Sequence, residues 1–500
     1  MTAGQRFAVL FATILGSSMV FIDGTIVSLA LPRMQSMFGA SAAQAQWVVE
    51  AYTLALGALM LLGGSLADRY GRKRIFVAGV IVFAGASLLC AVAPSMNFVI
   101  AARAAQGIGG MLLAPASLAL IASHFSGEER AKAVGTWSAM TAITTTIGPV
   151  AGGILIDHFT WRSVFLINVP VAAAVLIAAV YLEDARSEET GRLDFTGAIL
   201  VTLGFGGIVY ALIASQTAGW HAWSVWLWLI LGIASLGVFY AVEHRVTAPL
   251  VPPAIFKSRP FVALNAATFL LYGALGGFFF FFPFLLVQVY DYSVTAASFA
   301  FLPFILIVAV LSRTAGALSV RYGARSMIVV GTIFASLGFG ALGVLQHMGT
   351  YWSAFLPGAV LLGFGMSITV TPLTNGVMET ATPEHMGMAS GFNNAVSRIA
   401  GMLAIAALGA ILVATFNSRL DKRLASSSVQ VAQRRQIEAQ RDRLAGAQIA
   451  DRLGRKIVRD SYADGFTVIS VVSALLAFGA TVVVFGGLRK GEATSKDRET

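Results

Sequence analysis

The sequence predicts an all-α polytopic membrane protein that crosses the bilayer fourteen times. Its 500 residues are 57% hydrophobic and only 12% charged, and their mean hydropathy is +0.79. A soluble globular domain carries about 25% charged residues. A membrane-spanning helix needs roughly 20 apolar residues, so fourteen of them would occupy about 280 residues, or about 56% of the chain. These values exclude a soluble multidomain enzyme, a disordered chain, a coiled coil and collagen.

Each predicted span is an apolar stretch that ends at charged or turn-forming residues. The first is too long for a cleaved signal peptide, contains Asp23 and lacks a small-x-small cleavage site, so we interpret it as a span. In chain order, the predicted spans are 7–31, 46–66, 75–93, 98–123, 133–156, 164–182, 195–214, 223–242, 261–288, 296–319, 327–345, 352–378, 388–416 and 466–485.

The distribution of Lys and Arg predicts that both termini are cytoplasmic. An even number of spans puts the two termini on one side of the membrane. With the termini inside, the inner loops hold most of the basic loop residues, whereas the short outer loops hold only Arg33 and Arg162. The Arg-rich segment 417–461 lies outside and departs from this pattern, but long loops are translocated with little regard to their charge.

Two related loops indicate an internal repeat. Residues 64–73 read GSLADRYGRK after the second span, and residues 316–325 read GALSVRYGAR after the tenth. Because the repeat is displaced by eight spans rather than six, we infer two six-helix bundles in a pseudo-twofold arrangement, with two helices inserted between them. Parallel repeats of this kind bind their substrate near the membrane midplane between the halves. The predicted domains are an N-terminal six-helix bundle (1–182), two inserted helices with flanking loops (183–260), a C-terminal six-helix bundle that includes the periplasmic segment 417–461 (261–485) and a cytoplasmic tail (486–500).

The sequence offers little support for metal, cofactor or enzyme chemistry. Cys90 is the only cysteine, and none of the six histidines lies four residues from another. No Gly-Lys-Ser/Thr phosphate loop is present, and no nucleophile is paired with a base. The net charge of +10 is explained by membrane topology rather than by nucleic acid. We therefore expect no metal, no cofactor, no nucleic-acid partner and no enzymatic activity.

Six sequence motifs, in order along the chain, resemble those of one transporter family. FIDGTIVSLALP (21–32), GSLADRYGRKR (64–74) and RAAQGIGG in the fourth span are followed by GPVAGG in the fifth span, WRSVFLINVP (161–170) and RLDFTG (192–197). Together they resemble the major facilitator superfamily, in its fourteen-span drug/proton antiporter branch (EmrB/QacA type). The resemblance implies a proton-coupled, alternating-access exporter of hydrophobic or amphipathic small molecules in the bacterial cytoplasmic (inner) membrane, with multidrug efflux and antibiotic resistance as its outcome.

The resemblance also implies two sets of gating residues. In the second span and the loop after it they are Gly64, Asp68, Arg69, Gly71 and Arg72, and in the fifth span they are Gly148, Pro149, Gly152 and Gly153. Asp68 is implied to contact the positive N-terminus of the thirteenth span, which would be electrostatically favourable. Val320 takes the matching position in the second loop. Alternatively, the basic residues only anchor the loop, and the glycines only allow close helix packing.

Four ionisable residues inside spans are candidates for proton coupling or substrate binding: Asp23, Glu50, Arg103 and Arg398. Asp23 lies about 12 Å and Arg103 about 8 Å from the outer ends of their spans at 1.5 Å per residue, so the two can neutralise one another. Protonation or substrate binding would disturb such a pair. The alternatives are a static salt bridge for Asp23 and Arg103, and an acid facing the headgroups for Glu50.

Segment 417–461 and the function itself leave alternatives open. The segment has a helical period over 430–459, typical of a solvated hairpin, of a docking site for a periplasmic adaptor protein or of a headgroup contact. The partners of the chain would be protons, a small-molecule substrate and the bilayer. The alternative functions are an exporter dedicated to one endogenous metabolite or lipid-like compound, a passive facilitator, and a non-transporting membrane receptor.

Overall fold

The computed structural model is almost entirely helical over the residues that it describes, which are 3–184, 194–245, 256–380 and 386–488. Among these residues, twelve helices are long and apolar enough to cross a membrane, and α2 would be a thirteenth if its two arms, bent by 55°, form one span. The predicted span 164–182 forms only two short helices, α6 (Ser163–Leu166) and α7 (Asn168–Ala179). The all-α polytopic class is confirmed, whereas the number of fourteen spans stays a prediction.

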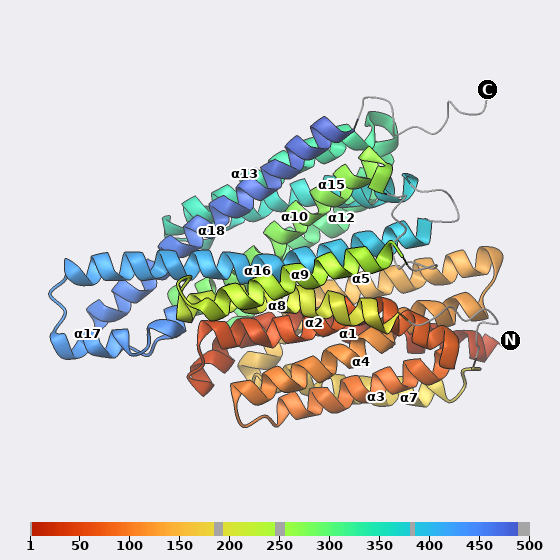
Figure 1. Cartoon of the computed structure of the whole chain (residues 1–500), viewed down its shortest axis with the longest axis horizontal. Coiled ribbons are helices and arrows are strands. Elements are labelled where there is room, and N and C mark those ends of the chain that lie inside the picture. Colours follow the sequence, from red (N-terminus) through yellow and green to blue (C-terminus); the bar gives the residue numbers. More distant parts are fainter. Residues whose placement is uncertain (1–2, 185–193, 246–255, 381–385, 489–500) are drawn as a thin grey trace. The chain divides into compact units, whose positions relative to one another are not determined.

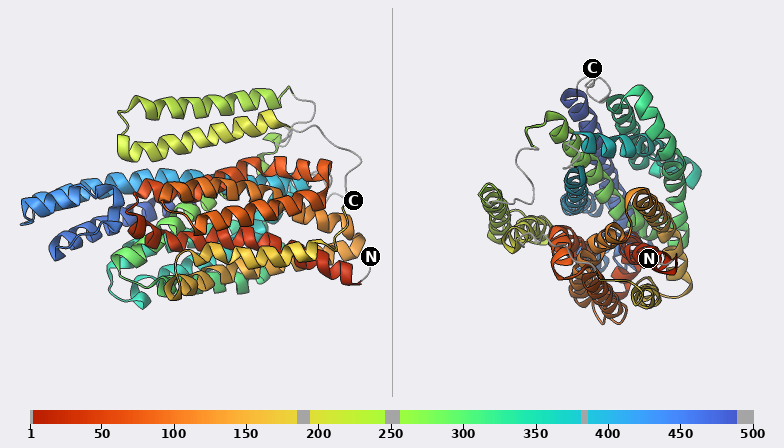
Figure 2. Two further views of the ribbon diagram at one scale, coloured as in Figure 1. Left: turned by 90° about the horizontal axis from the view of Figure 1, so that it is seen from below. Right: turned by 90° about the vertical axis from the view of Figure 1, so that its right-hand side faces the viewer.

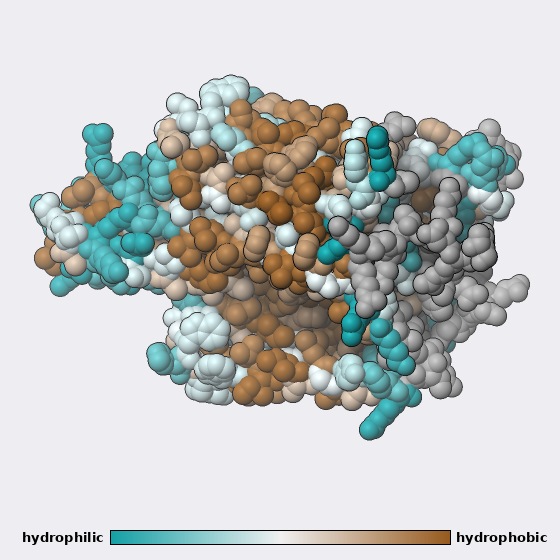
Figure 3. Space-filling view, turned by 90° about the horizontal axis from the view of Figure 1, so that it is seen from above, coloured by the Kyte–Doolittle hydropathy of each residue, from teal (hydrophilic) through white to brown (hydrophobic). Residues whose placement is uncertain are grey.

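The surface agrees with a membrane environment. On the face shown in Figure 3, hydrophobic side chains form a broad band across the middle, and hydrophilic side chains gather at the left end. Exposed apolar residues of this number are unusual on a soluble protein, but they are expected where lipid replaces water.

The chain folds into two compact units. Unit 1 comprises Met1–Ala211, Trp220–Leu250 and Tyr292–Ser298. Unit 2 comprises Leu212–Gly219, Val251–Asp291 and Phe299–Thr500. The predicted domain boundaries are a separate question, and they stay a prediction.

Unit 1 is built on α4, which packs against α1, α2 and α3, while α1 also packs against α5 and α7 (Figure 1). Small residues allow this closeness: a Cβ on Gly107 would lie 2.5 Å from the carbonyl oxygen of Tyr52 in α2. The long helices of this unit are α1 (Ala3–Phe38), α2 (Ala42–Tyr70), α3 (Arg72–Ala91), α4 (Met96–His124) and α5 (Gly127–His158).

The two helices that sequence analysis interprets as an insertion form a hairpin. Helices α8 (Phe195–Ala218) and α9 (Trp223–Glu243) lie side by side in Figure 2. They touch backbone to backbone, because a Cβ on Gly232 would lie 2.7 Å from the carbonyl oxygen of Gly204. Most of α9 is exposed and apolar, as expected of a helix that faces lipid.

In unit 2, α13 packs against α15 and α18, and α10 packs against α16 and α18. Four phenylalanines from α10, α13 and α18 form an aromatic core. The ring centroid of Phe278 lies 5.4 Å from that of Phe282, 5.2 Å from that of Phe339 and 5.1 Å from that of Phe466. The helices of this unit are α10 (Arg259–Phe284), continued by η2 (Leu285–Val289), α12 (Leu302–Tyr322), α13 (Ala324–Val344), α14 (Tyr351–Ala354), α15 (Leu356–Glu379), α16 (Met386–Ala425) and α18 (Arg452–Gly487). Helix α11 (Val294–Ala300) belongs to unit 1 as far as Ser298.

Segment 417–461 extends two of these helices into a small subdomain at the left of Figure 1. Helix α16 continues to Ala425, and α17 (Val431–Glu438) and η5 (Arg441–Gly446) lead back to α18. Leu420, Leu424 and Ile437 are buried in it, so the segment has its own apolar core. The helix expected over 430–459 is interrupted, because the backbone of Leu444 turns to a φ of 54° and Asp451 starts a new helix by accepting from the amide of Gly454 at 2.7 Å.

Candidate functional site

The charged centre of unit 1 is an ion pair between Asp23 of α1 and Arg103 of α4. Both side chains are buried, with 0% and 1% of their surface exposed. Arg103 Nη1 donates to Asp23 Oδ2, and Gln106 Nε2 donates to Asp23 Oδ1 at 2.8 Å. Arg103 Nη1 also donates to Gln106 Oε1 at 2.8 Å. Arg103 and Gln106 reach the same carboxylate because residues three apart share one face of a helix.

Helix α2 supplies further contacts that hold the arginine. Arg103 Nε donates to the carbonyl oxygen of Val48 at 3.1 Å, and its guanidinium carbon lies 4.0 Å from the centre of the Tyr52 ring. The hydroxyl of Tyr52 donates in turn to the carbonyl oxygen of Val20 in α1 at 3.2 Å. A cation over an aromatic face is stabilised most where water is excluded. These two contacts from α2 do not depend on the charge of Asp23.

A polar chain continues from this pair through the unit. Gln106 Nε2 lies 3.4 Å from Ser87 Oγ, Asn168 Nδ2 donates to the same oxygen at 2.9 Å, and Ser87 donates to the carbonyl oxygen of Phe165 at 2.9 Å. Helices α1, α2, α3, α4 and α7 therefore meet in one buried hydrogen-bond network. Such networks have large energetic consequences when one member changes its charge.

The chemistry of this network is set by its balance of charge. The buried Asp23 and Arg103 neutralise one another. Adding a proton to Asp23 would leave Arg103 buried without a counter-ion, and removing one partner of a buried pair costs about 3–5 kcal/mol. The network is therefore an arrangement that a single proton can shift strongly.

Glu50 of α2 is buried but lies apart from this pair. No part of its surface is exposed, and neither carboxylate oxygen has a hydrogen-bond partner among the described residues. Trp47 and Leu54 lie on the same side of α2 as Glu50, and they contact α8: Trp47 contacts Tyr210, and Leu54 lies close to Gly206. Tyr52, in contrast, faces α4. The structure therefore brings Asp23 and Arg103 together and leaves Glu50 on another side of α2. An unpartnered buried carboxyl is accommodated better as the neutral acid than as the anion.

The predicted gating loop between α2 and α3 is built on charge contacts. Arg72 Nε donates to Asp68 Oδ1 at 3.0 Å. The contact of Asp68 with the thirteenth span, which the family resemblance implies, stays a prediction. Gly71 has a φ of 109°, and a Cβ there would lie 2.5 Å from Asp184 Oδ2. At Gly64 there is room for a side chain, because an added Cβ would lie 3.7 Å from its nearest neighbour, Pro115 Cβ. The guanidinium of Arg69 lies over the ring of Tyr70.

Asp184, which sequence analysis missed, fixes this loop. The amide of Lys73 donates to Asp184 Oδ1 at 3.2 Å, and Arg74 Nε lies 3.1 Å from Asp184 Oδ2. Lys73 Nζ also donates to the carbonyl oxygens of Val180 and Leu182 at 3.3 and 2.6 Å, beyond the C-terminal end of α7. A charged residue just after an apolar span carries no signal that distinguishes it from ordinary interfacial anchoring.

The predicted glycine-rich gating motif lies on α5 and packs closely against α1. A Cβ on Gly152 would lie 1.9 Å from Ile26 Cγ1, and a Cβ on Gly148 would lie 3.0 Å from Thr25 Oγ1. Pro149 lies inside α5 without ending it. Because a side chain at Gly152 has no room, the motif does serve close helix approach, and its gating role stays a prediction.

The same helix also holds the N-terminal end of α11, within unit 1. A Cβ on Gly153 would lie 2.2 Å from Ser298 Oγ. One turn later, Asp157 Oδ2 accepts from the amide of Thr295 at 2.7 Å and Asp157 Oδ1 from that of Val294 at 3.3 Å. Arg33 lies 3.5 Å from the same carboxylate. A carboxylate at a helix N-terminus satisfies amides that have no partner within the helix.

Arg398 of α16 is half-buried in unit 2, and its role in coupling or substrate binding stays a prediction. A separate polar contact joins α16 to α10 nearby, where Asn393 Nδ2 donates to Thr268 Oγ1 at 2.8 Å and to Asn265 Oδ1 at 3.1 Å. Within the part of the chain that the structure describes, no three His, Cys, Asp or Glu side chains are grouped to hold a metal ion.

Comparison with known proteins relates most of the chain to one family. Residues 13–405 match the sequence profile of the Major Facilitator Superfamily. The chain is 33% identical over 417 residues to the multidrug resistance protein Stp of Mycobacterium tuberculosis, which covers 83% of this chain and 77% of that protein. It is 37% identical over 402 residues to the puromycin resistance protein of Streptomyces alboniger, which covers 79% of each. It is 32% identical to the tetracenomycin C resistance and export protein of Streptomyces glaucescens, which covers 82% of this chain and 76% of that protein.

Solved structures share the fold at low sequence identity. A bacterial homologue of the human lysosomal transporter Spinster, in an inward-facing conformation, superposes with a TM-score of 0.65 at 17% identity and covers 98% of this chain and 99% of that one. An auto-inhibited POT family peptide transporter superposes with a TM-score of 0.67 at 14% identity and covers 99% of both.

Proposed function

The chain belongs to the Major Facilitator Superfamily, a family of membrane transporters, and from that premise we propose that it is a proton-coupled multidrug exporter of hydrophobic or amphipathic small molecules. The observation that carries the proposal is the buried pair of Asp23 and Arg103, which lies in a network that one proton can shift. The multidrug and antibiotic resistance proteins to which the chain is similar support export as the direction of transport.

The proposed coupling follows from the contacts of the pair. When Asp23 takes up a proton, its attraction to Arg103 is lost, and Gln106 loses a charged acceptor. Arg103 remains held by Val48 and by the ring of Tyr52, so its positive charge stays in place without a counter-ion. The cost of that state favours a rearrangement of α1 against α4, which is the step that alternating access requires. Release of the proton restores the pair.

The proposed location is the bacterial cytoplasmic membrane, with both termini in the cytoplasm. Cys90 is buried and is the only cysteine, so a Cys90→Ser background permits accessibility mapping. In that background we expect Ser427→Cys, in the segment 417–461, to react with a membrane-impermeant maleimide in intact cells. Lys132→Cys, just outside the predicted span 133–156 on the proposed cytoplasmic side and 74% exposed, should stay unlabelled in the same cells. Labelling of Lys132→Cys but not of Ser427→Cys would reverse the orientation.

Flux into inverted membrane vesicles tests the proposed function. We expect a fluorescent amphipathic substrate to accumulate when the vesicle interior is acidified, and a protonophore to abolish the accumulation. Equilibration without dependence on the gradient would indicate a passive facilitator, and no flux with retained binding would indicate a receptor. A resistance panel separates the remaining alternative, since an exporter dedicated to one metabolite or lipid-like compound would protect cells against a single chemical class. An adaptor protein is a further proposed partner, which copurification after crosslinking would test.

A further inference from the structure

Glu50 of α2 is a buried acid that the proposed exchange at Asp23 does not use. None of its surface is exposed, and neither carboxylate oxygen has a hydrogen-bond partner among the described residues. Trp47, three residues before it, and Leu54, four residues after it, share its face of the helix. Both contact α8, the first helix of the inserted hairpin. Glu50 therefore lies on the side of α2 that α8 covers.

The neighbouring helices bring no opposite charge to this side of α2. Helix α8 contains no Asp, Glu, Lys, Arg or His, and its one titratable side chain is that of Tyr210. Arg103 of α4 packs on another side of α2 and is already paired with Asp23 of α1. The charged residues of α3, at 72–74, lie at its start, beside the far end of α2. The anion of Glu50 would therefore be uncompensated.

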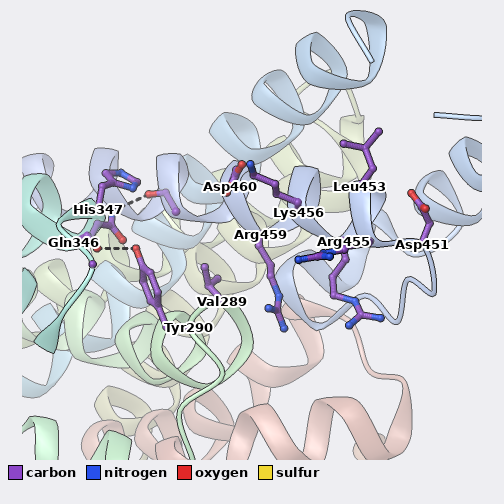
Figure 4. A pocket seen from close by; sticks show the side chains of 13 residues that line it. Val289, Tyr290, Gln346, His347, Asp451, Leu453, Arg455, Lys456, Arg459 and Asp460 are labelled. Atoms are coloured by element: carbon purple, nitrogen blue, oxygen red, sulfur yellow. Dashed lines mark hydrogen bonds between the residues drawn. The ribbon is translucent and has the colours of Figure 1, made fainter. Parts of the chain in front are cut away.

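Acids of unit 2 show the contrast. Asp291 makes a bidentate ion pair with Arg459, with both nitrogen–oxygen distances at 2.5 Å. Asp451 and Asp460 line a cavity of about 810 Å³ (Figure 4). The same cavity is lined by four basic residues of α18, which are Arg452, Arg455, Lys456 and Arg459. Those carboxylates have cations beside them, whereas Glu50 has neither a cation nor exposure to water.

The contact between α2 and the hairpin lies near the proposed outer surface of the membrane. The ring centroid of Tyr210 in α8 lies 6.1 Å from that of Trp47 and 5.2 Å from that of Trp228 in α9. All three residues lie near the outer ends of their predicted spans, and Trp and Tyr are typical of the membrane–water interface. Glu50 lies one turn further into the membrane, within reach of an outside proton once the contact opens.

The hairpin can separate from α2 at little cost in apolar contacts. In α9, three of the 21 residues are buried, so the hairpin is held mainly through α8. Lipid tails are as apolar as the side chains of α8 and can replace the contacts that it loses. The charge of Glu50 can therefore decide whether the contact forms.

We propose that Glu50 is a second proton-binding site, which controls the docking of the hairpin α8–α9 on α2. The neutral acid is accommodated in the closed contact. Loss of the proton leaves a buried anion without a partner, which is strongly unfavourable, so α8 moves away and the carboxylate is solvated. The docked state binds the proton more tightly, so docking strengthens as the pH falls and weakens as it rises, by at most about tenfold per pH unit. The inserted helices thus act as a flap that opens this side of α2 to the bilayer.

Electron paramagnetic resonance distances in the purified full-length protein, in lipid nanodiscs, test this proposal. In the Cys90→Ser background, spin labels are attached at Val92→Cys, at the end of α3, and at His221→Cys, between α8 and α9, both at exposed positions. With Glu50 intact, we expect one distance at pH 5.5 and an additional longer one at pH 8.5, with the ratio of docked to undocked protein at least about tenfold lower. Glu50→Gln should stay docked at both pH values. Glu129→Gln, at a side chain that is 54% exposed, should respond like the wild type.

Four results would overturn the proposal. Equal distances at both pH values with Glu50 intact would mean that docking does not depend on its proton. The same pH response in Glu50→Gln would assign the change to another titratable group. A longer distance at the lower pH would reverse the sign. Asp23→Asn, which tests the proposed exchange, should keep the pH response, and its loss there would assign the movement to the network of Asp23 and Arg103. The two proposals therefore fail independently.

Discussion

Asp23 accepts hydrogen bonds from both Arg103 and Gln106. Asparagine has nearly the same shape as aspartate, so replacing Asp23 by Asn removes the negative charge without changing the size of the side chain. We predict that Asp23→Asn abolishes accumulation driven by the proton gradient while the protein remains folded. The side-chain oxygen of Asn still accepts from Arg103, but the buried guanidinium loses its counter-ion, so we expect a loss of stability of about 3–5 kcal/mol. Vesicle flux with and without a gradient measures the coupling, and size-exclusion chromatography measures the folding.

A matched control is available on the surface of the same unit. Glu128 pairs with Lys132 one turn away, and its side chain is 82% exposed. Glu128→Gln should leave transport unchanged, because an exposed pair contributes at most about 1 kcal/mol. Wild-type drug resistance in cells that express Asp23→Asn would show that the pair is a static salt bridge.

Glu50 differs from Asp23 because nothing described in the structure compensates its charge. We predict that Glu50→Gln does not lower the melting temperature, since an amide is cheaper to bury than a carboxylate. We also predict that cells expressing the variant lose resistance to monocationic dyes but keep resistance to neutral drugs. Among the described acids of helices α1 to α5, Glu50 is the buried one whose negative charge can neutralise a cationic substrate. A melting temperature lowered as much as by Leu56→Ala would instead identify Glu50 as a structural residue.

Among the helices, α5 gives the sharpest test of close packing. Gly153 would place a Cβ 2.2 Å from Ser298 Oγ and 3.0 Å from Thr295 Cα, whereas Gly135 on the same helix has nothing within 4 Å. We predict that Gly153→Ala weakens the contact with α11 by about 1–3 kcal/mol and strongly reduces transport. Gly135→Ala should be neutral or slightly stabilising. Thermal unfolding and hydrogen exchange at the Thr295 amide measure the contact, and equal behaviour of the two variants would refute it.

The two related loops provide a second comparison at this scale. Gly71 and Gly323 both have positive φ values, of 109° and 81°, but only at Gly71 would an added Cβ meet a neighbour, Asp184 Oδ2 at 2.5 Å. Both alanine variants should lose about 1–3 kcal/mol through backbone strain. We predict a further loss in Gly71→Ala alone, together with faster hydrogen exchange at the Lys73 amide, which donates to Asp184. A larger destabilisation in Gly323→Ala would contradict this explanation.

At the scale of the whole molecule, the sequence predicts what depends on local hydrophobicity and fails where distant contacts decide. The apolar stretches identify the membrane helices, because lipid requires long apolar segments that satisfy their own backbone hydrogen bonds. The bend in α2 and the division of the sixth predicted span between α6 and α7 carry no such signal. The break in the helix at Leu444 could not be predicted either, because a helical period in the sequence shows which residues share a face and not whether the helical backbone is continuous.

The candidate site shows the same division. The pairing of Asp23 with Arg103 could be predicted, because two opposite charges at similar depth in a membrane have few other partners. Tyr52, Ser87 and Asn168 could not be predicted, since a tyrosine, serine or asparagine in a span is common. Only the packing of α2 and α3 on α4, and of α7 on α1 and α3, brings them to the network around the pair. The spacing of Gln106 three residues after Arg103 was the available signal for its role.

The charge of the transported molecule is a property of the whole membrane region. Asp23 is neutralised by Arg103, and among the described acids of helices α1 to α5 Glu50 is the buried one without a basic partner, so a dication would find too few counter-charges. The driving force points the same way if one proton enters per substrate. A membrane potential of roughly 100 mV supplies about 2.3 kcal/mol per charge. One pH unit supplies about 1.4 kcal/mol.

We therefore predict that the protein exports neutral or weakly acidic amphipathic compounds best, tolerates monocations and excludes dications. Export of a neutral substrate uses both the membrane potential and the pH difference, together about 3.7 kcal/mol, which sustains a concentration gradient of the substrate of several hundredfold. A monocation exchanged for one proton moves no net charge and keeps only the pH term, roughly tenfold. A dication is opposed by the potential. A resistance panel in an efflux-deficient bacterium, comparing lipophilic weak acids, neutral drugs, monocationic dyes and dicationic biguanides, measures this order. Strong protection against the dications alone would require further acids in the substrate path and more than one proton per cycle.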